Sequence, residues 1–525
     1  MSGPDSNKFF VTTPIYYVND QPHIGHAYTT LAADVTARFH RLAGRDVFFL
    51  TGTDEHGQKV AQSAAQNGET PQALTDRVSQ NFRDLTKLMN FSNDDFIRTT
   101  EPRNVAAAQA LWQAMAKATA PDGQPAIYLG SYSGWYSVRD EAFYDEGELK
   151  DGPDGGKLAP TGAPVAWVEE PSYFFRLSAY GDALLALYEA EPDLVAPSSR
   201  RNEIKSFVKG GLRDLSISRT SFSWGVPVPG DEKHVMYVWL DALVNYIAAL
   251  GYPNVDEGTK YARYWPADLH LVGKDIVRFH TVYWPAFLMA ANLPQPRRVF
   301  AHGWWTSEGQ KMSKSLGNVI APQNLVDTYG LDQARYLLMS EVPFGNDGDF
   351  SHISAVRRVN ADLANGIGNL AQRTLTLIQK NSGAAVPLHG EFTGQDKDLL
   401  DEANNLHSNV EAYLGKQSFH EVLRTIWSLI SSADIYIDTN APWALKKTDI
   451  DRMGTVLYVL AETLRAVAIV LQPFMPETMA RLLDQLAVPA NKRDFAALGE
   501  GGHLVPGTAL PPPQGLFPRI VEAAE

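Results

Sequence analysis

Short apolar runs alternate with amphipathic stretches over residues 1–120, and this alternation constrains the fold more than any other feature of the chain. Residues 8–17, KFFVTTPIYY, predict a buried strand, and residues 24–42 carry apolar side chains at helical spacing. A second strand is expected at residues 46–50, with further helical stretches after it. A strand–helix–strand succession of this kind predicts a parallel, doubly wound sheet.

The alternation is interrupted by a stretch rich in Gly, Tyr, Trp, Asp and Pro, which predicts a small inserted domain. Alternation then resumes, and beyond Asp349 the pattern is helical. We therefore predict an α/β protein with a Rossmann-type doubly wound parallel sheet, a small insertion and a following all-α helical bundle. The expected segments are the first half of the sheet domain (1–120), the insertion (121–218), the second half (219–300), a loop region (301–352), the bundle (353–490) and a tail (491–525).

No cysteine occurs among the 525 residues. The chain therefore cannot form a disulfide, a thiolate zinc site or a cysteine nucleophile. The N-terminus lacks the basic start and apolar stretch of a signal peptide, and no apolar run reaches the roughly 18 residues that span a bilayer. We expect a cytoplasmic protein with no membrane partner.

The formal net charge is −14 at pH 7, from 46 basic and 60 acidic residues. A nucleic-acid partner needs a local basic surface rather than a basic total. One candidate run consists of Arg200, Arg201, Lys205, Lys209, Arg213 and Arg219. A solvated helix face explains this run equally well, so charge neither supports nor excludes such a partner.

The tetrapeptide His23-Ile24-Gly25-His26 follows the first strand and opens the first helix. Two imidazoles three residues apart share one face of a helical turn, and a helix N-terminus offers N–H donors to an anion. A glycine between them lets a nucleotide approach the backbone closely. The motif predicts a site for ATP phosphates; taken alone, an ordinary surface pair or a metal pair would also explain it.

A second motif, Lys311-Met312-Ser313-Lys314-Ser315, lies in a polar, glycine-flanked loop. Two lysines among hydroxyl groups can fold over a triphosphate and neutralise the charge that develops as pyrophosphate leaves. On its own the motif would more often be an exposed basic loop.

Together, in this order on the two halves of an interrupted sheet, the motifs resemble the HIGH and KMSKS signatures of class I aminoacyl-tRNA synthetases. No P-loop competes for the nucleotide, because residues 152–157 have the wrong spacing. The insertion is too short for a large editing domain, and the absence of Cys excludes the zinc site of the cysteine enzyme. Nearly the whole chain resembles the methionyl-tRNA synthetases, in the segments TTPIYYVND, TGTDEHG, YVWLDALVNY, GKDIVRFH, KMSKSLGNV, GNLAQR and APW.

The resemblance implies roles for particular residues. Catalytic roles fall to His23, Gly25, His26, Lys311 and Lys314, and ATP binding to these together with Ile24, Met312, Ser313 and Ser315. Methionine would contact Ile15, Tyr17, Asp54, Trp239, Ala242, Tyr246, Ile276 and His280. The residues from Trp239 to Tyr246 share one helix face, which on spacing alone would equally suit ordinary core. The anticodon would contact Asn369, Arg373 and Trp443.

The same resemblance implies cofactors and partners: ATP with Mg²⁺, methionine and a methionine-accepting tRNA, initiator or elongator. Many relatives carry a zinc knuckle in the insertion, but the aligned places here, residues 136–140 and 158–161, read YSVRD and LAPT. We therefore expect no zinc and no protein metal site. The chain also lacks room after the bundle for a dimerisation module, which predicts a monomer.

Three other hypotheses about the function stay open. The chain could have another class I amino-acid specificity, or be a small-molecule nucleotidylyltransferase with an HxGH site, although the long helical segment argues against the latter. A non-catalytic RNA-binding protein derived from a synthetase is a third reading, against which both intact motifs argue. A pyrophosphate-exchange assay with each amino acid distinguishes these hypotheses.

Overall fold

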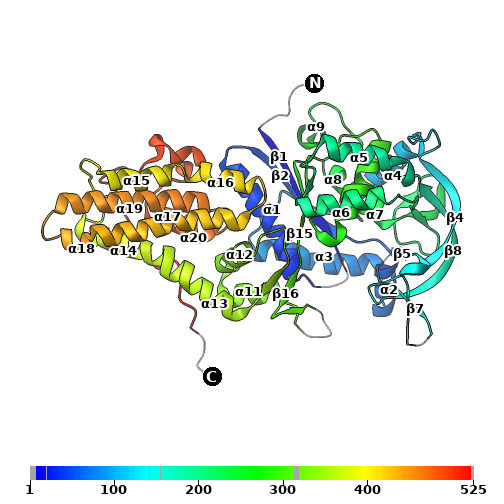
Figure 1. Cartoon of the computed structure of the whole chain (residues 1–525), viewed down its shortest axis with the longest axis horizontal. Helices are drawn as coiled ribbons and strands as arrows, with labels where there is room; N and C mark the ends of the chain where they lie inside the picture. The colour runs from blue at the N-terminus through cyan, green and yellow to red at the C-terminus, as the bar shows by residue number, and fades with distance from the viewer. Residues whose placement is uncertain (1–6, 19–20, 141, 154, 313–317, 522–525) are drawn as a thin grey trace.

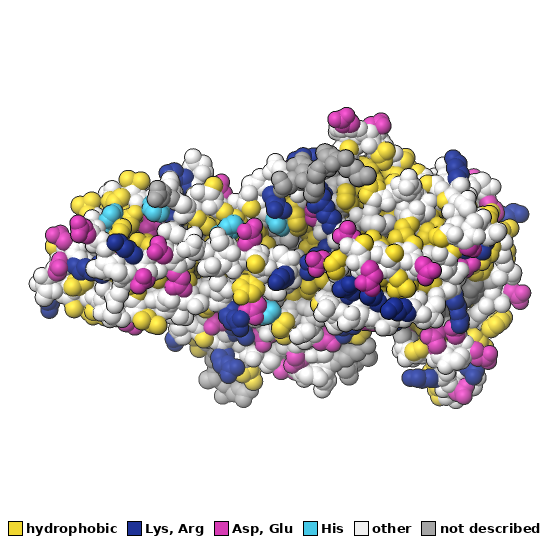
Figure 2. Space-filling model, turned by 45° about the horizontal axis from the view of Figure 1, so that its top comes forward, with side chains coloured by type: hydrophobic (Ala, Val, Ile, Leu, Met, Phe, Trp, Pro, Cys, Tyr) yellow, Lys and Arg dark blue, Asp and Glu magenta, His cyan; other side chains and the backbone are white. Residues whose placement is uncertain are grey.

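The computed structural model describes residues 7–18, 21–140, 142–153, 155–312 and 318–521. Figure 1 shows an elongated molecule with a sheet near its middle, a bundle of long helices at one end and a curved ribbon of strands at the other. On the face seen in Figure 2, Lys and Arg side chains lie interspersed with Asp and Glu.

The central sheet is parallel, with strand order β3-β2-β1-β14-β15-β9. Its strands are β1 (Lys8–Tyr17), β2 (Asp46–Asp54), β3 (Asp95–Arg98), β9 (Val195–Ala196), β14 (Leu269–Gly273) and β15 (Val299–His302). The parallel sheet and its interruption are confirmed. Tyr17 lies beside Asp54 in the ladder, and Gly273 beside His302, so the central strands end at one edge. Open α/β sheets bind ligands at such an edge, where the strand order switches.

Strand β9 joins this sheet from inside the segment 121–218, which the sequence pattern had suggested to be one inserted domain. The helices that flank it are α5 (Gly181–Ala190) and α6 (Ser198–Lys209). The segment thus contributes an edge strand as well as an insertion. A two-residue strand is too short to produce a periodic pattern, so the sequence carried no signal for it.

The insertion itself is an antiparallel ribbon of β4 (Ile127–Ser137) and β8 (Pro164–Phe175), seen at the far end in Figure 1. It is completed by β5 (Ala142–Tyr144), η1 (Glu146–Glu148), β6 (Lys150–Asp151), β7 (Lys157–Leu158), η2 (Leu177–Tyr180) and β10 (Leu215–Ser216). Two three-stranded sheets follow: β11 (Ser218–Arg219), β12 (Pro227–Val228) and β13 (Asp231–Met236), then β16 (Trp305–Ser307), β17 (Gln310–Lys311) and β18 (Gly348–Phe350).

Helices of the sheet domain are α1 (Ile24–Leu42), α2 (Gln58–Asn67), α3 (Pro71–Leu88), α4 (Pro102–Ala116), α7 (Val238–Leu243), α8 (Asn245–Ala248), α9 (Lys260–Tyr264) and α10 (Trp284–Ala290). Residues 238–248 form two short helices, α7 and α8, rather than one. The segment that leads into α10 begins as η3 (Lys274–Ile276) and the π-helix η4 (Phe279–Tyr283). Pro285 follows η4 and has no N–H for the helical ladder, which accounts for the widened turn.

Two helices that the sequence pattern did not indicate, α11 (Pro322–Tyr329) and α12 (Leu331–Ser340), lie inside the segment 301–352. Beyond Asp349 the chain is helical, as expected, with α13 (His352–Arg358), η6 (Val359–Ile367), α14 (Gly368–Asn381), α15 (Gly394–Asn404), α16 (Leu406–Leu414), α17 (Phe419–Asn440), α18 (Pro442–Leu445), α19 (Ile450–Leu471), α20 (Pro476–Gln485), η7 (Ala490–Lys492), η8 (Phe495–Leu498) and η9 (Glu500–Gly502). Helix α19 is long and apolar enough to cross a membrane, but 94% of its most apolar window is buried inside the protein. It is the central helix of the bundle.

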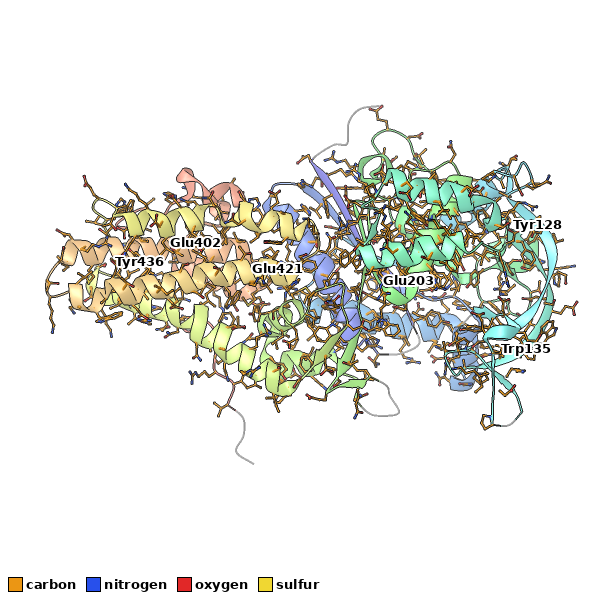
Figure 3. The ribbon with its side chains drawn as sticks, in the orientation of Figure 1. Tyr128, Trp135, Glu203, Glu402, Glu421 and Tyr436 are labelled. Atoms are coloured by element: carbon orange, nitrogen blue, oxygen red, sulfur yellow. The ribbon has the colours of Figure 1, made fainter. Side chains whose placement is uncertain are left out.

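A buried carboxylate ties three of these helices together. Asp396 of α15 accepts a hydrogen bond from Tyr436 of α17, labelled in Figure 3, at 2.5 Å, and a bidentate pair from Arg452 of α19 at 2.5 and 2.8 Å. Although burial opposes ionisation, these bonds lower the pKa of Asp396 to about 2. The carboxylate therefore stays charged, and its bonds fix how the helices pack.

Candidate active site

A cavity of about 650 Å³ opens at the carboxyl edge of the parallel sheet. Among its lining residues are Pro14 to Tyr17, His23, Gly25, His26, Thr29, Asp54, Lys59, Arg139, Asp140, Val238, Trp239, Ala242, Leu243, Tyr246, Gly273, Asp275, Ile276, His280, His302 to Thr306, Met312, Val319 and Asp347. The walls come from both halves of the sheet domain and from the insertion. A cavity of this size can hold a nucleotide beside an amino acid.

The turn before α1 holds the two imidazoles in a reciprocal capping arrangement. His23 Nδ1 accepts from the Gly25 N–H at 3.0 Å, and His26 Nδ1 accepts from the His23 N–H at 3.1 Å. The Ile24 N–H donates to Ile320 at 2.9 Å. These N–H groups are therefore already engaged, contrary to the expectation that the helix N-terminus would present free donors to phosphate.

The imidazoles can offer donors in place of the backbone. Each Nδ1 accepts a hydrogen bond, so each ring carries its proton on Nε2. Burial lowers the pKa of His23 and of His26, and the neighbouring His23 lowers that of His26 further. Both rings are therefore neutral donors on the cavity wall. A Cβ on Gly25 would lie 2.9 Å from His23 Cε1, so the glycine makes room for the ring.

Ile24, which was also predicted to bind ATP, does not lie on the cavity wall with His23 and His26. Its side chain is fully buried in the core beneath the turn and does not line the cavity.

The residues that the sequence assigned to methionine come together: Ile15, Tyr17, Asp54, Trp239, Ala242, Tyr246, Ile276 and His280 all line the cavity. Trp239 stacks on Phe279 with ring centroids 3.6 Å apart. Leu243, on the same helix, lines the cavity as well. The wall combines aromatic rings with aliphatic side chains and one carboxylate.

Two polar residues of this wall are bonded to each other. His280 Nδ1–H donates to the Ile276 carbonyl at 3.0 Å, and the Tyr246 hydroxyl donates to His280 Nε2 at 2.6 Å. Burial lowers the pKa of His280 to about 4 and raises that of Tyr246. Both groups are therefore neutral, and aromatic surface of this kind suits a polarizable thioether.

The predicted cationic loop begins at the end of β17. The backbone of Lys311 pairs with Thr306 of β16, and Met312 lines the cavity. Ser313, Lys314 and Ser315 lie outside the described residues.

Sequence reasoning missed a group of lining residues at the end of β15. Thr29 of α1 and His302 Nε2 are 2.7 Å apart, which joins the helix of the imidazoles to this strand. Trp304 donates from its indole to Asp275 at 3.1 Å. A Cβ on Gly303 would lie 2.1 Å from the Asn346 carbonyl oxygen, so only glycine permits the close approach of the next loop. The signal was the tetrapeptide HGWW directly after a buried strand.

Two protein-family models match the chain. A model described as "tRNA synthetases class I (M)" matches residues 9–154 and 157–375, and one described as "Anticodon binding domain of methionyl tRNA ligase" matches residues 386–525. The chain belongs to the methionyl-tRNA synthetase family.

Members of the methionyl-tRNA synthetase family match the chain over nearly its whole length. It is 59% identical to a methionine–tRNA ligase of Mesorhizobium japonicum, covering 98% of each chain, and 57% identical to one of Brucella suis, covering 99% of each. The structure also resembles methionyl-tRNA synthetase of Mycobacterium tuberculosis in complex with methionyl-adenylate. That likeness has a TM-score of 0.94 at 51% identity and covers 98% of this chain and 100% of the other.

In this methionyl-tRNA synthetase family member, the residues predicted to contact the anticodon lie at one place on the bundle. The guanidinium of Arg373 lies over the Trp443 ring, 5.3 Å from its centroid, and pairs with Asp438 at 2.7 Å. Trp443 is 46% exposed, which excludes the alternative that it is a core residue. Asn369 is exposed one turn earlier on α14.

Hydrogen bonds tie the insertion together at residues 136–140 and 158–161, where the sequence predicts no zinc site. Asp140 accepts from Tyr144 at 2.9 Å and from Thr161, and the Asp140 N–H donates to Ser137 at 3.2 Å. Arg139 donates to the Thr161 carbonyl at 2.8 Å. No group of three or more His, Cys, Asp or Glu side chains that could hold a metal ion occurs among the residues described.

The basic residues of α6 were a candidate nucleic-acid surface. They are partly paired with acidic side chains. Arg200 lies 2.8 Å from Glu203, labelled in Figure 3, and Lys205 pairs with Glu189. The run is therefore not a continuous cationic stripe.

Proposed function

We infer that this chain activates methionine with ATP and transfers the methionyl group to methionine tRNA. The observation that carries the inference is the single cavity in which the imidazole pair meets all eight residues assigned to methionine. A solved relative with this fold holds methionyl-adenylate, the product of such an activation. A matching anticodon-binding domain supports tRNA as the acceptor.

In the proposed first step, a methionine carboxylate oxygen attacks the ATP α-phosphorus, which forms methionyl-adenylate and releases pyrophosphate. The Asp54 carboxylate holds the substrate ammonium, as does the Ile15 backbone, and Mg²⁺ arrives on the nucleotide. His23 and His26 donate Nε2–H bonds to phosphate oxygens, while Lys311 and Lys314 neutralise the departing pyrophosphate.

In the second step, the 3′-terminal hydroxyl of tRNA attacks the adenylate carbonyl and releases AMP. The protein needs no covalent nucleophile, because it acts by positioning both reactants and stabilising charge. Arg373, Trp443 and Asn369 read the anticodon by stacking and by polar contacts.

The experiment that tests this function is ATP–pyrophosphate exchange with each amino acid in turn. We expect exchange with methionine and transfer of methionine to tRNA. Exchange with a different amino acid would replace the assigned substrate. Adenylyl transfer to a small-molecule acceptor without any exchange would favour a nucleotidylyltransferase, and tRNA binding without either reaction would favour a non-catalytic protein.

We further propose that the protein is a cytoplasmic monomer, without zinc and without a membrane partner, and that its segments divide at residues 120, 218, 300, 352 and 490. The bonds around Asp140 support the zinc-free insertion, because they join the loops that a metal would otherwise hold. Elemental analysis of the purified protein should find less than stoichiometric zinc. Tightly held zinc whose removal unfolds the insertion would overturn this proposal.

A further inference from the structure

Three consecutive ionisable residues at the end of β2 point in different directions. Asp54 lines the cavity. Glu55 and His56 are buried, and each bonds to a different part of the sheet domain. The two residues that follow Asp54 therefore anchor the strand end that carries it.

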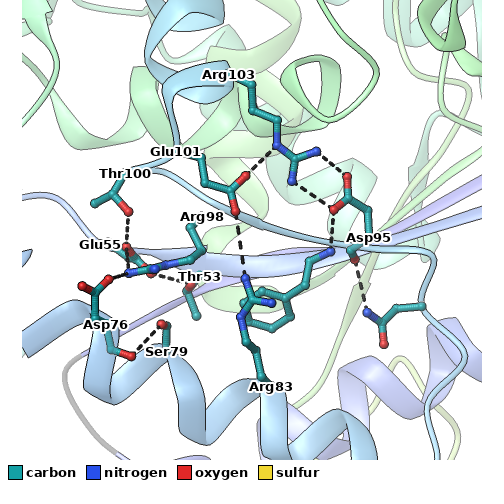
Figure 4. Close-up of polar contacts among 12 residues, drawn as sticks. Thr53, Glu55, Asp76, Ser79, Arg83, Asp95, Arg98, Thr100, Glu101 and Arg103 are labelled. Carbon is teal, nitrogen blue, oxygen red and sulfur yellow. Dashed lines mark hydrogen bonds and ion pairs between the residues drawn. The ribbon is translucent and has the colours of Figure 1, made fainter.

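Glu55 anchors the first side of this strand end, as Figure 4 shows. Its carboxylate accepts from Arg98 at 2.7 and 3.0 Å, from Thr53 at 2.8 Å and from Thr100 at 2.5 Å. Arg98 in turn pairs with Asp76 of α3 at 2.5 Å. The buried negative charge is thus compensated, and the strand end is fixed to β3 and α3.

His56 anchors the other side, across the sheet domain. Its Nδ1 lies 2.6 Å from Asp241 Oδ2, and the other carboxylate oxygen of Asp241 accepts from Asn104 at 2.8 Å. Trp224 closes the site with its ring edge-on to the imidazole, and its indole donates to the Glu55 carbonyl at 2.7 Å. Although burial opposes protonation, the charge of Asp241 and its hydrogen bond raise the pKa of His56 and favour the protonated imidazole.

Asp241 lies on the helix that forms the opposite wall of the cavity. Its α7 neighbours Trp239 and Ala242 line the cavity, while Asp241 itself is 1% exposed and faces away. One buried hydrogen-bonded pair, His56 and Asp241, therefore joins the strand end that carries Asp54 to the helix that carries the aromatic wall.

We propose that His56 and Asp241 are positioning residues for amino-acid activation, which set the distance between the ammonium-binding carboxylate of Asp54 and the side-chain wall on α7. This inference rests on the proposed role of Asp54. The pair contacts no substrate, and it acts by holding two recognition elements in register across the cavity. A misplaced carboxylate would weaken binding of the ammonium more than binding of the thioether.

The test is steady-state exchange with Asp241→Asn, which keeps the shape and removes the charge. We expect the methionine KM to rise at least tenfold, while kcat and the ATP KM change less than about threefold. Glu101→Gln, in the neighbouring network of Figure 4 but outside the cavity, is the matched control and should behave as wild type. A fall in kcat together with an equal rise in the KM values of methionine and ATP would show a general structural defect and overturn the proposal.

Because Asp241→Asn alone could fail to fold, His56→Gln/Asp241→Asn provides a second variant with no uncompensated buried charge. Two competitive inhibitors then separate the causes: methioninol, which keeps the ammonium, and the methionine analogue with hydrogen in place of the amino group. We expect the double variant to be inhibited less strongly than wild type by methioninol and equally strongly by the analogue without the amino group. An equal loss for both inhibitors would assign the pair to wall packing.

Asp54→Asn distinguishes the premise from the inference. An unchanged methionine KM in that variant would overturn the proposed role of Asp54 itself. A raised KM with Asp54→Asn, together with an unchanged KM in both pair variants, would overturn only the positioning role.

Discussion

At the residue scale, the site depends on histidines that are kept neutral. His280 commits both ring nitrogens to neighbours, and His23 and His26 commit their Nδ1 atoms to the backbone. Burial favours the neutral form of all three rings. Because a neutral imidazole is a donor on only one side, its hydrogen-bond partner determines what it offers a ligand.

This neutrality predicts a pH dependence of stability. Burial lowers the pKa of His280 from its ordinary value of 6.5 to about 4, so only the unfolded chain takes up this proton as the pH falls through that window. The contribution of His280 to the free energy of unfolding should therefore be fully present above pH 6.5 and should decline toward pH 4, by at most about 1.4 kcal/mol per pH unit.

Thermal unfolding followed by circular dichroism checks this at several pH values. The apparent Tm of His280→Gln should fall less steeply than that of wild type below pH 6.5. His503→Gln, at a partly exposed histidine, is the control. Parallel Tm profiles for wild type and His280→Gln would contradict the assignment.

At the scale of elements, the corner between α17 and α18 presents the predicted anticodon residues. Ala441 ends α17 with a left-handed φ of 42°, and Pro442 starts α18 with the φ that a first helical turn needs. The turn holds Trp443 at the surface over Arg373 of α14. This tight corner brings together the side chains of residues 373 and 443, which lie 70 residues apart in the sequence.

Removing the exposed ring of Trp443 should impair tRNA charging and leave methionine activation unchanged. Loss of a stacked base costs about 1–3 kcal/mol, so Trp443→Ala should lower kcat/KM for tRNA charging by roughly 5- to 150-fold. Exchange should be unchanged, because the bundle corner is remote from the cavity. Tyr413→Ala, at an exposed aromatic on α16 of the same bundle, serves as the control. Loss of exchange together with helix content would mean that Trp443 supports the fold.

At the scale of the whole molecule, one buried arginine connects the catalytic sheet domain to the bundle. Arg335 of α12 is fully buried and pairs with Asp34 of α1 at 2.6 Å. It also donates to the carbonyls of Met89, Pro473 and Phe474 at 2.8 to 2.9 Å. The helix that begins at the imidazoles and the loop between α19 and α20 therefore share one cation.

Arg335→Met should destabilise the protein by about 3–5 kcal/mol, because it removes one of the two guanidinium groups that pair with the buried Asp34 carboxylate and takes a donor from three backbone carbonyls. We expect a lower Tm and faster proteolysis between sheet domain and bundle. Asp34→Asn/Arg335→Met should recover part of the loss. The control Arg424→Met, at an exposed arginine that pairs with the half-buried Glu421, should cost at most about 1 kcal/mol. A Tm equal to wild type in Arg335→Met would show that the domains dock by apolar packing alone.

Local patterns in the sequence were sufficient for the fold class and for the family. The apolar run of β1 and the helical spacing of α1 reflect burial on one or two faces, which each segment carries by itself. The two signature motifs and the segments around them pointed to the same family that the comparisons identify. They did so because a nucleotide site requires particular residues at fixed short spacings.

Contacts between distant segments were decided only by the tertiary structure. His56 meets Asp241 across 185 residues, and Arg335 meets Asp34 across 301. The edge strand β9 and the Ile24 N–H, which donates to Ile320, likewise depend on partners elsewhere in the chain. A residue's own neighbours in sequence determine whether it can be buried in a strand or helix. Which charge it meets there depends on how the sheet orders its strands, and no local pattern encodes that order.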